Sequence, residues 1–329
     1  MARRIRWLGL GMVLCFFVLI LQLNNVQVFE AHSYATDSRN PAVKAQAQQP
    51  RGAIQSADGV ILAKTVPAPK GSAFKYERVY PKATAALFSG VVGVDSPLYD
   101  NYGVEESYDS YLVAHTKPIT SLKGLLTTGG SVTDTVTLTI STKLQEAAQR
   151  ALGSQDGAVV ALDPQTGAVL AMYANPYYDP NLLSSLNLKT ERFAWALDNT
   201  KDQYGFDPLT SLAYQDGSQF GPGSTFKTIT TAAAYDHAPQ LVNTPMPSFP
   251  GEGAIPSHYF MGQSVPLNND SFEPCGGTIA VMLPESCDTG YAILGTRIGA
   301  ASMTAEAESF GFNQQPPIDL PPSSGEVSN

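Results

Sequence analysis

The stretch Phe220-Gly221-Pro222-Gly223-Ser224-Thr225-Phe226-Lys227-Thr228 decides the fold and the chemistry expected of this chain. Its Pro-Gly pair breaks the preceding backbone, and the run from Ser224 onward predicts a helix that enters an apolar core. Ser224 and Lys227 are three residues apart, so on a helix they lie on one face. A serine hydroxyl becomes a good nucleophile when a base takes its proton, and a buried lysine can be that base. With backbone donors at the helix start for an oxyanion, the stretch predicts an acyl-transfer site.

Two other interpretations of this stretch compete. A Ser-x-x-Lys spacing arises by chance about once in a chain of this length, so by itself it is weak. The segment from Gly221 to Thr228 also fits the phosphate-binding pattern G-x-x-x-x-G-K-[ST], except that Phe226 stands where the second glycine is required. That glycine lets backbone N–H groups close around a phosphate, and a phenylalanine side chain would block them. The residues therefore favour acyl transfer over nucleotide binding.

Composition bounds the class of protein. The chain has 329 residues, 43% of them hydrophobic and 15% charged, with a formal net charge of −9. A folded core in one large or two medium domains is expected, and nucleic acid is not an expected partner. The histidines lack the spacing of metal ligands, so no metal site and no cofactor is predicted. They are His32, His115, His237 and His258.

The N-terminus predicts a membrane anchor. Arg3, Arg4 and Arg6 precede an apolar run at 7–23 that only Gln22 interrupts. Positive charges before such a run favour a cytoplasmic N-terminus, with the bulk of the chain on the outer side of the cytoplasmic membrane. The run is about as short as a spanning helix can be, and no clear cleavage site follows it. We therefore expect an uncleaved, single-pass transmembrane helix rather than a signal peptide.

Local patterns predict the other elements. The region 75–112 is expected to hold a short helix and loops without evident chemistry. Thr142 with Gln145 is typical of a capping box at a helix start. Strands at 157–162 and 168–173 are apolar on both faces, so we expect helices to cover the sheet that they form. The remaining predicted elements are strands at 51–54 and 58–63 joined by an Asp-Gly turn, a strand at 136–140, and helices at 142–152, from 224 and near 288–311.

At this point the motifs, taken in order, resemble one family. The agreement covers nearly all of the chain, and although each motif is weak, their shared order is specific. The motifs are Arg51-Gly52, Asp58-Gly59, Leu62-Ala63, Tyr102-Gly103-Val104-Glu105, Leu138-Thr139-Ile140, Val159-Val160-Ala161-Leu162-Asp163, Thr166-Gly167, Asn175-Pro176, Asp179-Pro180-Asn181, Pro222 to Lys227, and Ser286-Cys287-Asp288-Thr289. Together with the Arg-flanked anchor, they identify the chain as similar to class B penicillin-binding proteins of the actinobacterial elongation type. These are membrane-anchored peptidoglycan D,D-transpeptidases.

The resemblance implies a fold and a domain order. The fold class would be α/β, more strictly α+β. An anchor at 1–25 would precede an elongated, loop-rich β pedestal domain of the dimerisation type at 26–130. The first part of a transpeptidase domain, similar to penicillin-binding proteins and serine β-lactamases, would occupy 131–329. The implied partners are D-Ala-D-Ala stem peptides, β-lactams, the cytoplasmic membrane, and a glycan polymerase with the elongation or division machinery.

The resemblance also assigns roles to four residues. Ser224 would be the acylated nucleophile and Lys227 the general base. Ser286 and Asp288 match the second family motif, in which Ser286 relays a proton to the leaving D-alanine amine and Asp288 helps hold the substrate amide. On residues alone, Ser286 and Asp288 are also typical of a helix cap. A carboxylate near Lys227 favours the charged amine, which opposes its use as a base.

The third family motif, Lys-[Ser/Thr]-Gly, is missing. Lys227 is the last lysine in the sequence, which ends at Asn329. We therefore expect a C-terminally truncated transpeptidase domain with little or no activity. The main alternative is a non-catalytic, membrane-anchored scaffold of the cell-wall machinery. A soluble β-lactamase fits less well, because of the anchor and the long N-terminal region.

Cys275 and Cys287 are expected on the outer side of the membrane, where disulfides can form. A bridge between them would tie the Ser286 loop, and two unpaired buried thiols are the alternative.

Overall fold

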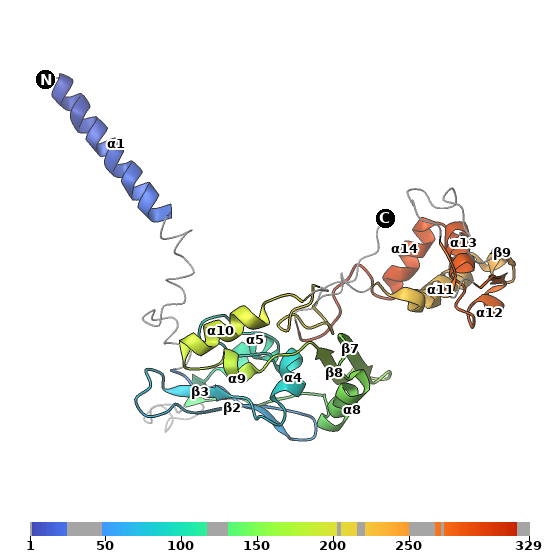
Figure 1. The fold of residues 1–329 in the computed structure, drawn as a ribbon, viewed down its shortest axis with the longest axis horizontal. Coiled ribbons are helices and arrows are strands. Elements are labelled where there is room, and N and C mark those ends of the chain that lie inside the picture. The colour runs from blue at the N-terminus through green and yellow to red at the C-terminus, as the bar shows by residue number, and fades with distance from the viewer. Residues whose placement is uncertain are drawn as a thin grey trace, which may run out of the picture. The chain divides into compact units, whose positions relative to one another are not determined.

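The computed structural model describes residues 2–24, 48–116, 131–202, 205–215, 221–249, 267–270 and 273–320. The chain divides into two compact units, whose elements are shown in Figure 1. The first unit comprises Met1–Ala213 with Asp319–Pro321, and the second comprises Tyr214–Ile318 with Pro322–Asn329. The predicted domain boundaries at 25/26 and 130/131 differ from this division and stay a prediction.

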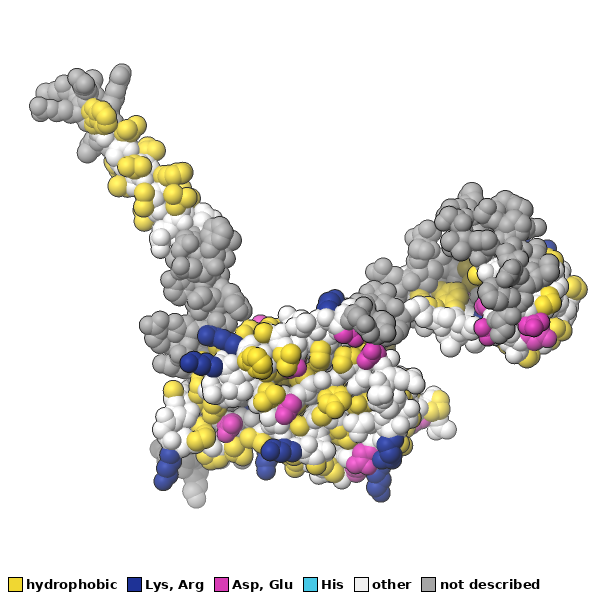
Figure 2. All heavy atoms as spheres, viewed as in Figure 1, with side chains coloured by type: hydrophobic (Ala, Val, Ile, Leu, Met, Phe, Trp, Pro, Cys, Tyr) yellow, Lys and Arg dark blue, Asp and Glu magenta, His cyan; other side chains and the backbone are white. Residues whose placement is uncertain are grey.

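Helix α1 covers Ala2–Asn24. Its apolar side chains lie exposed, among them Trp7 at 66% and Phe16 at 63% (Figure 2). Across the described ranges, no helix is both long enough and apolar enough to cross a membrane.

A four-stranded sheet lies in the first unit, in the order β3-β2-β1-β6. Its strands are β1 (Ile54–Gln55), β2 (Ile61–Pro67), β3 (Tyr76–Val79) and β6 (Val136–Thr137). β1 and β2 pair antiparallel, which confirms the predicted hairpin, and Gly59 in its turn has a φ of +78° that glycine adopts without strain. β6 runs parallel to β1 and is shorter than the predicted strand at 136–140. Backbone hydrogen bonds to the β1 segment nevertheless continue, from Leu138 N–H to Gln55 O and from Ala57 N–H to Ile140 O, and Ser141 N–H then donates to Leu170 O.

Short helices and strands surround this sheet. Helix α4 contacts β2, β8, α8 and α9, and its Leu87 and Phe88 are buried. It is the short helix predicted within 75–112, whereas strand β3 in the same region was not predicted. The elements are α4 (Ala85–Val92), α5 (Val104–Ser107), α6 (Asp109–Leu112), β4 (His115–Thr116), β5 (Ser131–Val132), α8 (Thr142–Leu152), β7 (Gly157–Leu162), β8 (Val169–Asn175), α9 (Pro180–Leu183) and α10 (Leu188–Asp198).

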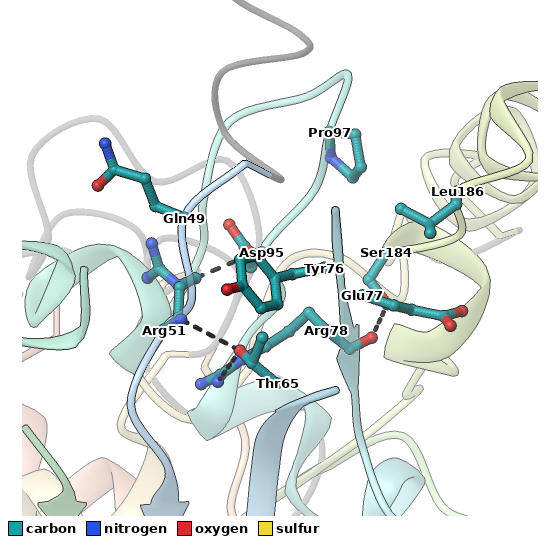
Figure 3. Close-up of a pocket in the computed structure, with 10 residues that line it drawn as sticks. All are labelled: Gln49, Arg51, Thr65, Tyr76, Glu77, Arg78, Asp95, Pro97, Ser184 and Leu186. Carbon is teal, nitrogen blue, oxygen red and sulfur yellow. Dashed lines mark hydrogen bonds and ion pairs between the residues drawn. The ribbon is translucent and has the colours of Figure 1, made fainter. Parts of the chain in front are cut away.

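A buried cluster of charges holds these elements together. Glu105 is fully buried and accepts hydrogen bonds from Arg51 Nε at 3.1 Å and from Arg78 Nε at 2.6 Å. The Tyr80 hydroxyl also donates to Glu105, and burial raises the pKa of Tyr80 well above its usual value. Both arginines line a pocket of the first unit (Figure 3). The region that sequence patterns left without a role therefore carries an ion-paired core.

Helix α8 and the β7–β8 hairpin form where they were predicted. The predicted capping box is wrong, because the N-cap of α8 is Ser141 and Gln145 is fully buried. Gln145 Nε2 donates to Met172 O at 2.6 Å, and its Oε1 accepts from Met172 N–H at 2.8 Å. The side-chain amide thus pairs with both the N–H and the C=O group of Met172 in β8, as the backbone of a neighbouring strand would.

The hairpin is covered less completely than predicted. Alternate residues of β7 are exposed, including Val160 at 42% and Leu162 at 56%, whereas Ala171 to Ala174 of β8 are buried. Helices α4 and α8 do contact the hairpin, as expected, but the alternate residues of β7 stay exposed among the described residues. Apolar composition predicts a strand that can be buried, and it does not tell which face has a packing partner.

The second unit is mainly helical. Its core includes Ala234, Met282 and Leu294, all fully buried. The helix predicted near 288–311 is two helices, because Gly299 between them has a φ of +91°. The elements are the 3-10 helices η2 (Gly223–Thr225) and η3 (Pro239–Leu241), the helices α11 (Phe226–His237), α12 (Ile279–Met282), α13 (Asp288–Ile298) and α14 (Ala300–Ser309), and the paired strands β9 (Met246–Phe249) and β10 (Cys275–Gly277).

Candidate active site

Ser224 lies in η2, directly before α11. Gly223 has a φ of +55°, so it makes the turn that places the next residue at the helix start. Ser224 is exposed, whereas Lys227 is only 8% exposed and lies on the side of the helix that also buries Thr230. The turn η2 therefore presents a hydroxyl to solvent, and the first turn of α11 holds an amine inside the protein.

Ser286 and Asp288 lie at the start of α13. Ser286 has a φ of +52°, which is uncommon for a residue with a side chain and is found at sites that surrounding contacts hold in place. The N-cap of α13 is Cys287, and no side chain there accepts a capping hydrogen bond. The interpretation of Ser286 as a helix cap is therefore wrong. Cys287 forms a disulfide with Cys275, which decides between the bridge and the two unpaired thiols that the sequence left as alternatives.

The structure brings all four predicted site residues together. Lys227 Nζ lies 3.0 Å from Ser224 Oγ, 3.0 Å from Ser286 Oγ and 2.7 Å from Ser286 O. It also lies 2.5 Å from Asp288 Oδ1. The Ser286 hydroxyl donates to Ser224 Oγ at 2.9 Å. One amine thus links the two hydroxyls and the carboxylate, although α11 and α13 are far apart in sequence.

The number of acceptors around Lys227 exceeds the number of its protons. An ammonium carries three hydrogens, and four oxygens lie within 3.0 Å of Nζ. The three protons must therefore be shared among the four oxygens, through bifurcated or alternating hydrogen bonds, which keeps both hydroxyls within reach of the amine. Asp288 supplies the negative charge beside the amine, with 34% of its side chain exposed.

Two further residues beside Lys227 were not predicted. The Tyr291 ring centroid lies 5.9 Å from Lys227 Nζ, and the Tyr291 hydroxyl is 2.7 Å from Thr231 Oγ1. Burial raises the pKa of Tyr291. Thr231 follows Lys227 by four residues on α11, and Tyr291 follows Asp288 by three on α13. Because residues three or four apart on a helix share a face, the spacing from Lys227 and Asp288 could have predicted both residues from the sequence.

Within the described part of the chain, no histidine is among the hydrogen-bond partners of Lys227, Ser224 or Ser286. His237 Nε2 lies 3.1 Å from Glu306 Oε2, which links α11 to α14. His32 and His258 lie outside the described residues. Among the residues that the structure describes, no group of three His, Cys, Asp or Glu side chains is placed to hold a metal ion.

Two regions of the chain match family models of known proteins. Residues 157–328 match the penicillin binding protein transpeptidase domain, and residues 51–132 match the penicillin binding protein A dimerisation domain. The chain is 33% identical to the peptidoglycan D,D-transpeptidase PbpA of Mycobacterium tuberculosis, over 95% of this chain and 62% of the relative. It is also 33% identical to PbpA of Mycolicibacterium smegmatis, over 95% of this chain and 63% of that protein.

Solved structures agree with the sequence matches. The crystal structure of PBPA from M. tuberculosis has a TM-score of 0.71 and 31% identity, and the match covers 86% of this chain and 63% of that one. Its penicillin G acyl-enzyme complex has a TM-score of 0.70 and 30% identity, covering 86% and 64%. The chain spans about 62% of the length of its curated relative from M. tuberculosis. With both regions matched and a third of the residues shared, the chain belongs to the class B penicillin-binding proteins of the actinobacterial elongation type.

Proposed function

We propose that the protein is a serine D,D-transpeptidase, which cross-links peptidoglycan stem peptides and binds β-lactams through Ser224. The observation that carries the proposal is the convergence of the Ser224 and Ser286 hydroxyls on Lys227 Nζ, each at 3.0 Å. A nucleophile, a base and a second proton carrier are the groups that acyl transfer needs within hydrogen-bond reach. The relatives named above are called D,D-transpeptidases, and one is solved as a penicillin G acyl-enzyme.

The proposed reaction has two halves. In the first, Ser224 Oγ bonds to the carbonyl carbon of the penultimate D-alanine while its proton passes to the neutral amine of Lys227. A proton then moves through the Ser286 hydroxyl to the nitrogen of the terminal D-alanine, whose C–N bond breaks. In the second half, an amine of another stem peptide attacks the ester, loses its proton to Lys227, and Ser224 regains its hydrogen. Asp288 orients Lys227 and the substrate amide throughout.

A β-lactam would follow the first half only. Opening of its ring breaks the C–N bond, but the nitrogen stays attached to the rest of the acyl group and blocks the second amine. The ester on Ser224 therefore persists.

A second candidate function is a non-catalytic scaffold. The sequence contains no Lys-[Ser/Thr]-Gly after Lys227, the motif that the family places on the opposite wall of the cleft. On this ground we propose that acylation of these 329 residues is slow or absent. In the scaffold case, residues 26–130 would bind a glycan polymerase or other elongation or division proteins.

The proposal includes a location. The run at 7–23, with its three preceding arginines, would anchor the protein in the cytoplasmic membrane and leave the bulk of the chain outside. Deletion of residues 1–25 should move the protein from the membrane fraction to the soluble fraction. Retention in the membrane after deletion would contradict the anchor.

Incubation with a fluorescent penicillin, followed by intact-mass and peptide analysis, tests the enzyme proposal. We expect slow labelling confined to Ser224, and none in Ser224→Ala. An adduct that persists in Ser224→Ala would refute the assigned nucleophile. No labelling of the wild-type chain after long incubation would favour the scaffold.

A further inference from the structure

Helix α13 begins without a capping side chain of its own. Its N-cap residue, Cys287, is bound through sulfur to Cys275, and its side chain caps no backbone N–H group of the helix. The two neighbours whose side chains favour caps, Ser286 and Asp288, contact Lys227 instead. A first turn without a cap leaves backbone N–H groups unpaired, which destabilises the helix start.

Asn269, from a separate segment of the chain, supplies the missing acceptor. Its Oδ1 accepts from Thr289 N–H at 2.9 Å and from the Thr289 hydroxyl at 2.9 Å. Its Nδ2 donates to Glu273 O at 2.9 Å, which fixes the orientation of the amide. Asn269 is 7% exposed and Thr289 fully buried, so water has little access to replace these bonds.

We propose that Asn269 is a positioning residue of the Ser224 site. By capping α13 from outside, it leaves Ser286 and Asp288 to contact Lys227, and it holds the turn that carries them. The left-handed φ of Ser286, +52°, needs such surrounding contacts to persist. The consequence for acylation rests on the proposed function, whereas the cap and the contacts with Lys227 do not.

Three variants of the full chain test the inference. Asn269→Ala removes the acceptor, and Asn269→Asp keeps an oxygen that Thr289 can bond. Asn187→Ala is the matched control, because Asn187 caps α10 in the first unit through a hydrogen bond from Lys189 N–H at 3.2 Å. Hydrogen exchange of the Thr289 amide reports the cap. We expect exchange about fivefold to thirtyfold faster in Asn269→Ala and near wild type in the other two.

A second measurement reports whether Ser286 and Asp288 still contact Lys227, and it needs no enzyme activity. Lysines are acetylated with acetic anhydride, and mass spectrometry compares Lys227 with the exposed Lys75 as internal reference. We expect Lys227 to react at least about fivefold faster in Asn269→Ala only, because its contacts with Ser286 and Asp288 loosen. Where Ser224 is acylated by penicillin, the maximal rate should fall in Asn269→Ala at unchanged apparent affinity, and Asn269→Asp should restore it.

Each outcome decides the inference. Unchanged Thr289 exchange in Asn269→Ala would overturn the cap. Faster exchange with unchanged Lys227 acetylation, or equal acceleration by Asn187→Ala, would overturn the positioning role. If wild type forms no penicillin adduct, the proposed function fails for this chain, while exchange and acetylation still decide the role of Asn269.

Discussion

Two segments of this chain carry a lysine three residues after a serine, and they have different structures. Ser72 lies in the turn before β3, where its Oγ accepts from Phe74 N–H at 3.1 Å, and Lys75 is exposed. Ser224 and Lys227 lie one helical turn apart, with Nζ and Oγ separated by 3.0 Å and the lysine buried. The spacing therefore makes a reactive pair only where a helix brings the two side chains to one face and the fold buries the amine.

The two units also differ in how they use charge. In the first unit, Glu105 is fully buried between Arg51 and Arg78, so its carboxylate is closed to solvent. In the second unit, Lys227 is buried but its neighbour Ser224 is exposed, so the cluster is open on one side. A closed cluster stabilises the fold, and an open one can receive a substrate.

The largest expected effect separates the two serine–lysine pairs. Lys227→Met should slow the formation of the Ser224 adduct with a labelled penicillin by about 10²–10⁴, the usual contribution of a general base. Lys75→Met should leave that rate unchanged. Intact-mass kinetics measures both. Equal rates in wild type and Lys227→Met would show that the amine is not the base. The Ser224–Lys227 pair would then be no more reactive than the Ser72–Lys75 pair on account of its lysine.

The closed cluster should respond in stability rather than in reactivity. Glu105→Gln leaves two buried guanidinium groups without their shared carboxylate, so we expect a loss of about 3–5 kcal/mol in the free energy of unfolding of the first unit. Glu106→Gln, at the exposed next position, should change little. Denaturant unfolding followed by Trp195 fluorescence, in a Trp7→Phe background, measures the difference. A loss below about 1 kcal/mol in Glu105→Gln would mean that the cluster is not an energetic core.

Sequence patterns predicted the parts of this molecule that local spacing determines. The helix after Pro222, helix 142–152 and the β7–β8 hairpin each have their turn and periodicity signals within a few residues. Ser286 and Asp288 were found through the order of the family motifs, and the structure brings them to Lys227.

Contacts that depend on tertiary packing were missed. The spacing of Thr142 and Gln145 suggests a capping box, yet the Gln145 side chain hydrogen-bonds the backbone of Met172 in β8. Buried backbone N–H and C=O groups need hydrogen-bond partners, and Gln145 supplies them here. Asn269 lies in a Pro/Gly-rich stretch without periodicity, so nothing in its neighbourhood points to Thr289. The exposed face of β7 is a further example. Its apolar composition is compatible with burial, but it does not tell whether another element packs against that face.

Glu191 extends the comparison to a buried carboxyl whose pKa is set more by burial than by the nearby cation of Arg192. It is fully buried and accepts from the Ser96 hydroxyl at 2.5 Å and from Leu98 N–H at 2.9 Å, and no hydrogen-bond partner within the described residues reaches its Oε2. Burial raises its pKa from 4.5 to about 7. The folded state therefore holds a proton that the unfolded state releases between about pH 4.5 and pH 7.

Stability of the first unit should accordingly fall as pH rises through that window and level off above it. The loss is at most about 3.5 kcal/mol, at about 1.4 kcal/mol per pKa unit between 4.5 and about 7. Glu191→Gln cannot titrate, so its stability relative to wild type should increase by a similar amount between pH 4.5 and pH 8. The same Trp195 unfolding assay measures this. Parallel pH profiles for wild type and Glu191→Gln would contradict the raised pKa.

The smallest effect concerns the disulfide that holds the open cluster. Cys275 and Cys287 are 12 residues apart, and closing a loop of that size stabilises by about 2–3 kcal/mol. Cys275→Ala with Cys287→Ala should therefore speed hydrogen exchange in α13, yet slow Ser224 acylation by less than tenfold if Asn269 still caps the helix. Combining this pair with Asn269→Ala tests that explanation, because two supports of one turn should be coupled rather than additive. Additive effects would mean that the disulfide and Asn269 stabilise different parts of the second unit, and that the start of α13 is held in some other way.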